Sequence, residues 1–280
     1  MKTILFPTDF SANSIHASRY AAMLATKTGA KIIILHGYPV PIPIANEQQL
    51  IFDTEISVLK SEVDATENLG VFTQKFITDT HLTSTNITQM IEYGLLSDVI
   101  IKVANSTDID CIVMGTKGID DAIDRWIGTN AQRVIESVEC PVWLIPEKTP
   151  INLPKSILYA ADFEEDEALA TKKILEIAHP LGATCNVIHI HEKFETNTFN
   201  TIEKEVADLE NTFGNEDVTF KNLNKEGVID SLDVYIKTNK PDVLALAVYE
   251  KSFLRKMFNA SISQYFVEDA SLPMLTFKKR

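Results

Sequence analysis

The chain has 280 residues, which is enough for two domains of ordinary size. Its 45% hydrophobic and 23% charged residues are typical of a folded globular protein, and no apolar run approaches the roughly 18 residues of a membrane-spanning helix. The net charge of −13 argues against nucleic acid as the main partner, because phosphate backbones are bound by clustered lysine and arginine, but one small anion can still be held by backbone N–H groups.

The first ten residues and the cysteines indicate the cellular compartment in which we expect the protein. Pro7 and Asp9 interrupt the apolar start, so it lacks the uninterrupted apolar region of a secretory signal. Cys111, Cys140 and Cys185 are an odd number without metal-ligand spacing, and we interpret them as reduced packing residues. We therefore expect a cytoplasmic protein that has no membrane partner.

Short predicted strands alternate with helical segments along the first half. Runs of β-branched and other apolar residues predict strands at Thr3–Phe6, Ile32–Leu35, Phe72–Ile77, Ile112–Met114 and Val142–Ile145. Between the first two, apolar residues at helical spacing predict a helix with Ser11 as N-cap and Gly29 just beyond its end. Alternating strands and helices indicate an α/β fold with a mostly parallel, doubly wound, flavodoxin- or Rossmann-like sheet. In such a sheet a ligand binds outside the carboxyl ends of the strands, where the strand order reverses.

The second half of the chain repeats the first. Four segments align in the same order: Lys2–Phe10 with Lys155–Phe163, Gly29–His36 with Gly182–His189, Asp110–Gly115 with Asp242–Ala247, and Pro141–Leu144 with Pro273–Thr276. Three prolines between Pro146 and Pro154 mark a linker, because proline removes an amide donor and favours extended backbone before it. We predict two repeats, residues 1–148 and 153–280, each with a five-stranded sheet and helices on both faces.

A glycine pattern follows the predicted strand that ends at Met114. Gly115 and Gly118 come directly after this strand, and Gly128 later precedes Thr129 and Asn130. Glycines let the backbone approach a phosphate closely, while a helix that begins near Thr129 points its N–H groups and dipole at the anion. The pattern predicts a phosphate site, and the alternative is that the glycines are turns and Thr129 is a helix cap.

Repeat two provides a comparison for that alternative. Thr129 with Gln132 and Ser261 with Gln264 both fit a capping box, so a helix start is predicted in both repeats. The three glycines are answered in order by Ala247, Glu250 and Ala260. A carboxylate at position 250 would repel a phosphate, a cost that the nearby Lys251, Arg255 and Lys256 could reduce. We predict that repeat two keeps the fold and loses phosphate binding.

Asp9 follows Pro7 and Thr8 just beyond the first strand. A carboxylate there can accept hydrogen bonds from ribose hydroxyls, or it can cap the following helix. Repeat two keeps this residue as Asp162 although it is predicted to have lost its ligand, so the structural role stays open beside the binding role.

Histidines and further acids offer weaker signals. His36 is matched by His189 at a strand end, and we interpret both as packing residues whose neighbouring backbone is the ligand contact. His189 and His191 share one face of a strand, but no third ligand stands at a telling spacing, so we expect no metal site. An acidic turn could hold Mg²⁺ carried by phosphates or form a solvated face; it contains Asp120, Asp121 and Asp124.

These motifs resemble the universal stress protein family, present in two copies. The resemblance rests on Pro7–Ser11, Ile34–His36, Met114–Gly115 with the glycine pattern, and Cys140–Val142. In the nucleotide-binding branch of that family, the glycine pattern holds the phosphates and ribose of ATP. The aspartate after the first strand lies near the nucleoside, and backbone after the second strand meets adenine.

Carried over to this sequence, the resemblance implies a site for ATP, or for AMP or ADP, in repeat one. The phosphate and ribose roles fall to Gly115, Gly118, Gly128, Thr129 and Asn130. The nucleoside role falls to Asp9 with Pro7 and Thr8, the adenine edge to His36 and Gly37, and Met114 and Thr116 complete the set. A larger apolar residue is usual at position 37, so glycine would leave a gap beside the base. Repeat two departs at every glycine and resembles the branch that does not bind ATP.

The resemblance also implies how the repeats meet. Family members commonly pair through their last strands, so a tandem chain is similar to such a dimer made covalent. Val142–Ile145 and Met274–Phe277 would then form the contact, and a homodimer of the whole chain stays open.

We therefore expect a cytoplasmic stress-response protein in which repeat one binds an adenine nucleotide and repeat two acts as a pairing or regulatory partner. A dedicated catalyst is not expected, because no Ser-His-Asp or Cys-His arrangement stands out and no lysine follows the glycine pattern as in a P-loop. Two alternatives stay open: slow ATP hydrolysis or adenylyl transfer in which Asp9 orients water, and a ligand-free interaction scaffold.

Overall fold

The protein is described from a computed structural model. The described residues are 1–38, 50–116, 128–161, 166–191, 196–224, 227–248 and 271–279. Within these ranges no helix is both long enough and apolar enough to cross a membrane.

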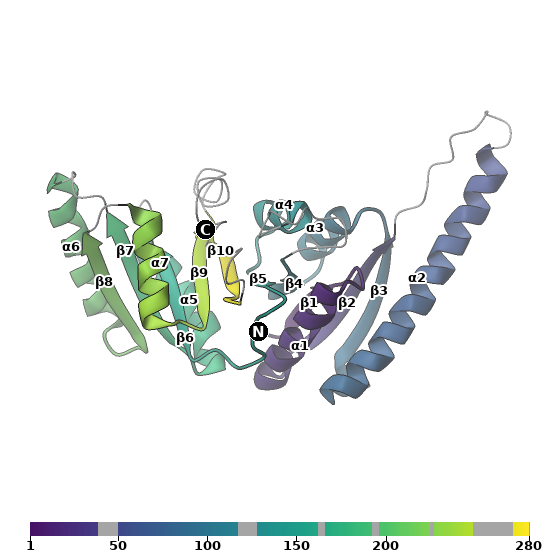
Figure 1. The fold of residues 1–280 in the computed structure, drawn as a ribbon, viewed down its shortest axis with the longest axis horizontal. Helices are drawn as coiled ribbons and strands as arrows, with labels where there is room; N and C mark the ends of the chain where they lie inside the picture. Colours follow the sequence, from purple (N-terminus) through teal and green to yellow (C-terminus); the bar gives the residue numbers. More distant parts are fainter. Residues whose placement is uncertain are drawn as a thin grey trace.

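Each half of the chain contributes five strands (Figure 1). The first half contains β1 (Thr3–Pro7), α1 (Ala12–Thr28), β2 (Lys31–Tyr38), α2 (Leu50–Thr80), the 3₁₀ helix η1 (Ser84–Asn86), β3 (Ile87–Tyr93), α3 (Leu96–Ser106), β4 (Cys111–Gly115), α4 (Thr129–Ser137) and β5 (Val142–Ile145). The second half contains β6 (Ser156–Ala161), α5 (Glu167–Leu181), β7 (Thr184–His191), α6 (Thr196–Phe213), β8 (Val218–Asn224), α7 (Val228–Asn239), β9 (Val243–Val248) and β10 (Met274–Lys278).

The ten strands form one sheet in the order β3-β2-β1-β4-β5-β10-β9-β6-β7-β8. Strands within each half are parallel, and the predicted α/β, doubly wound architecture is confirmed. Helices α1, α2, α5 and α6 contribute to the core on one face, and α3, α4 and α7 to the core on the other. Since both faces are covered, the central strands are buried along their length and read as continuous apolar runs.

The limits of α1 follow the predicted signals. Ser11 is the N-cap, and its hydroxyl accepts the N–H of Ser14 at 3.1 Å. Gly29 ends the helix in the left-handed region, with φ of 72°. Gly182 ends α5 in the same way, with φ of 74°.

The same aspartate contact fixes the start of each half. One carboxylate oxygen of Asp110 accepts the backbone N–H groups of Lys2 and Thr3, both at 2.7 Å. Asp242 makes the matching pair of bonds beside β6, at 2.8 and 3.0 Å. The two halves therefore share contacts at the level of single side chains as well as strand order.

The strand predicted at Phe72–Ile77 is wrong, because these residues lie in α2 and the strand beside β2 is β3. Phe72 and Phe76 are one helical turn apart, and their rings stack against Phe6 with centroids at 6.1 and 6.5 Å. Ala65 and Leu69 continue the same buried stripe toward the helix start. Aromatic and β-branched residues suggested a strand, but their spacing serves a helix face.

The two halves join through an antiparallel pair of strands. Trp143 of β5 lies opposite Leu275 of β10, and both side chains are fully buried. These are the strands in which the repeats were expected to meet. Tyr20 of α1 packs on the Trp143 ring at 5.8 Å, so the junction is also covered from one face.

A fragment of residues 1–148 should self-associate, because removing the second half exposes the edge of β5 and its four buried residues. Analytical ultracentrifugation across a concentration series checks this, with the full chain at matched concentration as the reference. A folded fragment that associates no more than the full chain would contradict the role of β5 as a pairing edge.

Candidate functional site

The predicted site residues converge on one edge of the sheet. Strand β1 lies between β2 and β4, so the strand order reverses between β1 and β4, the position where α/β sheets bind ligands. Pro7 ends β1 and is followed by Thr8 and Asp9. His36 and Gly37 lie near the end of β2, and Met114 and Gly115 end β4 just before Thr116. All eight therefore belong to the carboxyl ends of three adjacent parallel strands.

The start of α4 is fixed against the end of β4. The N–H of Gly128 donates to the carbonyl of Thr116 at 2.7 Å, and Gly128 is the N-cap of the helix that begins with Thr129 and Asn130. The first amides of a helix have no acceptor within the helix, and the helix dipole is positive there. The contact places an anion-favouring helix end at the switch point. Gly118 and the acidic turn at Asp120, Asp121 and Asp124 lie outside the described residues.

The predicted capping box at Thr129 is wrong. The N-cap is Gly128, with φ of −70° and ψ of 160°, and no side-chain cap bond is made. The Gln132 side chain instead donates to Glu136 at 3.1 Å. Gly128 marks the helix start by backbone geometry, which glycine permits as readily as a capping side chain. Ser261 and Gln264 fall outside the described part of the chain.

The turn after β1 is held in a strained shape. Phe10 adopts φ of 62°, which is uncommon for a residue with a side chain. The Thr8 hydroxyl accepts the Phe10 N–H at 3.0 Å, and the Asp9 carboxylate accepts the Ser11 N–H at 3.0 Å. The Phe10 ring lies 4.3 Å from that of His36. Asp9 thus supports the turn before α1, while Ser11 caps the helix.

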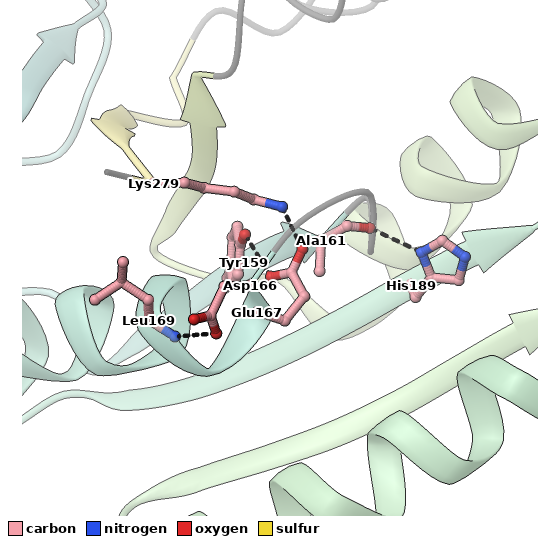
Figure 2. Close-up of polar contacts among 7 residues, drawn as sticks. All are labelled: Tyr159, Ala161, Asp166, Glu167, Leu169, His189 and Lys279. Carbon is pink, nitrogen blue, oxygen red and sulfur yellow. Dashed lines mark hydrogen bonds and ion pairs between the residues drawn. The ribbon is translucent and has the colours of Figure 1, made fainter.

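His36 and its counterpart in repeat two, His189, make the same hydrogen bond to a backbone carbonyl. Nδ1 of His36 donates to the carbonyl of Thr8 at 2.8 Å, and Nδ1 of His189 donates to the carbonyl of Ala161 at 3.0 Å (Figure 2). A carbonyl can only accept, so the proton lies on Nδ1 in both rings. Because the bond occurs in both halves, it serves the fold, as interpreted from the sequence.

Gly37 is glycine for a reason within the chain. A Cβ atom there would lie 3.0 Å from the Leu96 Cα and 3.3 Å from the Gly94 carbonyl oxygen. The backbone between β3 and α3 therefore fills the space beside Gly37. The expected gap beside a base is not found on that side of the residue.

Sequence reasoning missed Asn13 and Ser14 in the first turn of α1. The Ser14 hydroxyl lies 3.0 Å from that of Thr8, and the Asn13 side chain donates to the Thr116 hydroxyl at 3.3 Å. Both residues are buried although polar. Their signal was available as polar residues on the core-facing side of an otherwise apolar helix, which indicates partners in the fold.

The cysteines do not form a nucleophilic centre. Burial raises the pKa of the Cys140 thiol to about 11 and of the Cys185 thiol to about 12, and it raises that of Cys111 further. The thiolate is the reactive form, so these thiols are inert near neutral pH. All three are free cysteines, as predicted for packing residues.

Among the described residues, two cavities lie near the junction of the halves. One of about 300 Å³ is lined by residues that include Met1, Asp110, Trp143 and Lys278. The other, of about 430 Å³, is lined by residues that include Tyr20, Asp242 and Lys240. Neither contains a predicted site residue, so they do not bear on the glycine pattern.

Comparison with known proteins decides the family. Residues 1–146, just over half the chain, match the universal stress protein family. The chain belongs to this family.

Relatives and solved structures extend the match. A universal stress protein of Methanocaldococcus jannaschii is 28% identical over 149 residues, which cover 51% of this chain and 81% of that protein. One of Thermus aquaticus is 27% identical over 145 residues, covering 51% and 98%. The crystal structure of a universal stress protein from Archaeoglobus fulgidus covers 99% of this chain and 96% of its own, with 17% identity and a TM-score of 0.67. The fold of both halves is therefore that of a solved universal stress protein structure.

The second repeat of this universal stress protein carries different chemistry at the matching place (Figure 2). Glu167, aligned with Ser14, accepts bonds from the Tyr159 hydroxyl at 2.8 Å and the Lys279 ammonium at 2.5 Å. The exposed fractions of the Glu167 and Lys279 side chains are 5% and 2%. Where repeat one has two hydroxyls, repeat two has a buried ion pair that ties α5 to the end of β10.

Lys279→Met should destabilise the protein by roughly 3–5 kcal/mol, because it leaves the Glu167 charge buried without its cation. The double variant Glu167→Gln/Lys279→Met should recover most of this loss. Urea unfolding measures both. Lys75→Met, which breaks an exposed pair with Asp79, is the control and should cost less than about 1 kcal/mol. Equal losses for Lys279→Met and the double variant would show that the pair is not coupled.

Proposed function

We propose that this universal stress protein binds one adenine nucleotide, ATP or its AMP or ADP relative, at the carboxyl edge of repeat one. In this proposal residues 1–148 form the nucleotide-binding repeat and residues 153–280 a pairing and regulatory partner. Mg²⁺, where present, is carried by the phosphates.

The observation on which the proposal depends is the hydrogen bond from the Gly128 N–H to the Thr116 carbonyl. It holds the start of α4 beside the end of β4, next to β1, so the helix amides and dipole meet the switch point of the sheet. This is the arrangement that nucleotide folds use for phosphate. The glycine pattern resembles that of the nucleotide-binding branch, and membership of the family supports the same reading.

The backbone conformation of Gly128 could be adopted by any residue, and this supports the proposal. Its φ of −70° is open to any residue, so the conformation gives no reason for glycine. A bound phosphate does give one, because a side chain would keep the backbone N–H groups of the helix start away from it.

Repeat two supports a single site. Ala247 replaces Gly115 at the end of β9, and it is buried in the core. Glu167, which stands at the position of Ser14, forms a buried ion pair with Lys279, and Ala161 stands at the position of Thr8. The second repeat thus has its own stabilising contacts where the first presents small and polar groups.

Isothermal titration calorimetry should find one ATP per chain in the unmodified protein. Gly128→Val should weaken binding by more than about tenfold, or about 1.4 kcal/mol, while its permissive φ allows the backbone of the helix start to keep its conformation; circular dichroism and thermal melting check that the variant is folded. Ala247→Gly is the matched variant in repeat two and should keep one site.

Mass spectrometry of nucleotide released from the purified protein identifies the ligand. Two sites would contradict the asymmetry between the repeats. No binding of ATP, ADP or AMP at millimolar concentration would contradict the proposal and favour the scaffold alternative, whereas ATP turnover that disappears in Asp9→Ala would favour the enzyme alternative.

A further inference from the structure

The space beside Gly115 where a Cβ atom would lie is filled by the side chain of Asn13. A Cβ atom built there would lie 3.0 Å from Cγ of Asn13, 3.1 Å from Oδ1 and 3.2 Å from Nδ2. These separations are tighter than most Cβ contacts, so the Asn13 amide would have to shift by a few tenths of an ångström to admit any residue other than glycine. The φ of Gly115 is not positive, so the backbone itself does not require glycine. The requirement comes from Asn13.

Asn13 is linked by hydrogen bonds to Thr116 at the end of β4 and, through Thr116, to Gly128 at the start of α4. Its Nδ2 donates to the Thr116 hydroxyl at 3.3 Å, and the Thr116 carbonyl accepts the N–H of Gly128 at 2.7 Å. A short chain of contacts therefore runs from the first turn of α1, through the end of β4, to the start of α4. Asn13 is 9% exposed, so its hydrogen bond to Thr116 is sheltered from competing water.

Repeat two shows the alternative arrangement at the same two positions. Asp166 aligns with Asn13, but it is the N-cap of α5 and its carboxylate accepts the Leu169 N–H at 3.0 Å (Figure 2). Ala247 aligns with Gly115 and is 3% exposed. Repeat one combines the buried amide of Asn13 with Gly115. Repeat two combines the helix-capping carboxylate of Asp166 with the methyl group of Ala247.

We infer that Asn13 is a positioning residue for the nucleotide site, and that the pair Asn13 and Gly115 sets the positions of Thr116 and Gly128, which lie at the end of β4 and the start of α4 in repeat one. The expected effect of Asn13 on ligand affinity rests on the proposed nucleotide function. The contact itself does not, because Asn13 donates to Thr116 whether or not a ligand is present. Asn13 acts through Thr116 and Gly128.

The first experiment separates positioning from general stability. In Asn13→Ala, the Gly128 amide should exchange its hydrogen about tenfold faster, and ATP should bind about tenfold more weakly by calorimetry. Asp166→Ala is the matched control in repeat two. It removes the cap of α5 and should lower the melting temperature by roughly 2–4 °C, with ATP affinity and Gly128 exchange unchanged.

The second experiment tests the steric pairing. Gly115→Ala alone should lower the melting temperature by roughly 2–4 °C, because its methyl group meets the Asn13 amide. In the Asn13→Ala background the same change should cost nothing, since the space is open and the φ is permissive. ATP affinity should not return in the double variant, because the contact to Thr116 stays lost.

The outcomes are distinct. Unchanged Gly128 exchange in Asn13→Ala, or an equal cost of Gly115→Ala in both backgrounds, overturns the positioning role. Faster exchange with unaltered ATP affinity overturns its link to binding. Failure of the unmodified protein to bind ATP, ADP or AMP overturns the proposed function, and the exchange and pairing results then still decide whether Asn13 holds the loop.

Discussion

The antiparallel pairing of β5 with β10 is the contact on which the architecture depends. It turns two five-stranded sheets into one ten-stranded sheet and removes one exposed edge from each half, so that only β3 and β8 stay at the edges. The helices then cover both faces from end to end, and α2 packs near one outer strand as α6 packs near the other (Figure 1). The junction uses the last strand of each half, so β4, which carries part of the candidate site, pairs with a junction strand and β1 lies one strand further out.

Duplication of one scaffold explains what the halves share and where they differ. The backbone contacts that set the fold recur: Asp110 and Asp242 at the strand starts, His36 and His189 at the strand ends, and Gly29 and Gly182 after the helices. The halves differ at the switch point, where Ser14 is answered by Glu167 and Gly115 by Ala247. A fold maintained by the repeated contacts leaves these positions open to change, which is how one half can carry a ligand site and the other a buried ion pair.

Much of the fold could be predicted because its signals are local. Ser11 and Gly29 fixed the limits of α1 through capping geometry, and continuous apolar runs marked β1, β2, β4 and β5. The error at Phe72–Ile77 arose because the burial of Phe72 and Phe76 against Phe6 is a tertiary contact that residue preferences do not contain. Gly128 and Thr129 were placed correctly at a helix start, but the cap came from backbone geometry and not from a side chain. Asn13 escaped prediction because its partners, Gly115 and Thr116, are distant in the sequence and carry no shared motif.

The central claim is that one half of this universal stress protein binds an adenine nucleotide at the carboxyl ends of β1 and β4 while the other half, built on the same scaffold, does not. A crystal structure of the full chain grown with a non-hydrolysable ATP analogue tests this most directly. The account predicts one analogue per chain, with its phosphates against the amides that begin α4 beside Thr116 and Gly128. An analogue bound at the carboxyl ends of β6 and β9, or phosphates bound away from α4, would contradict it.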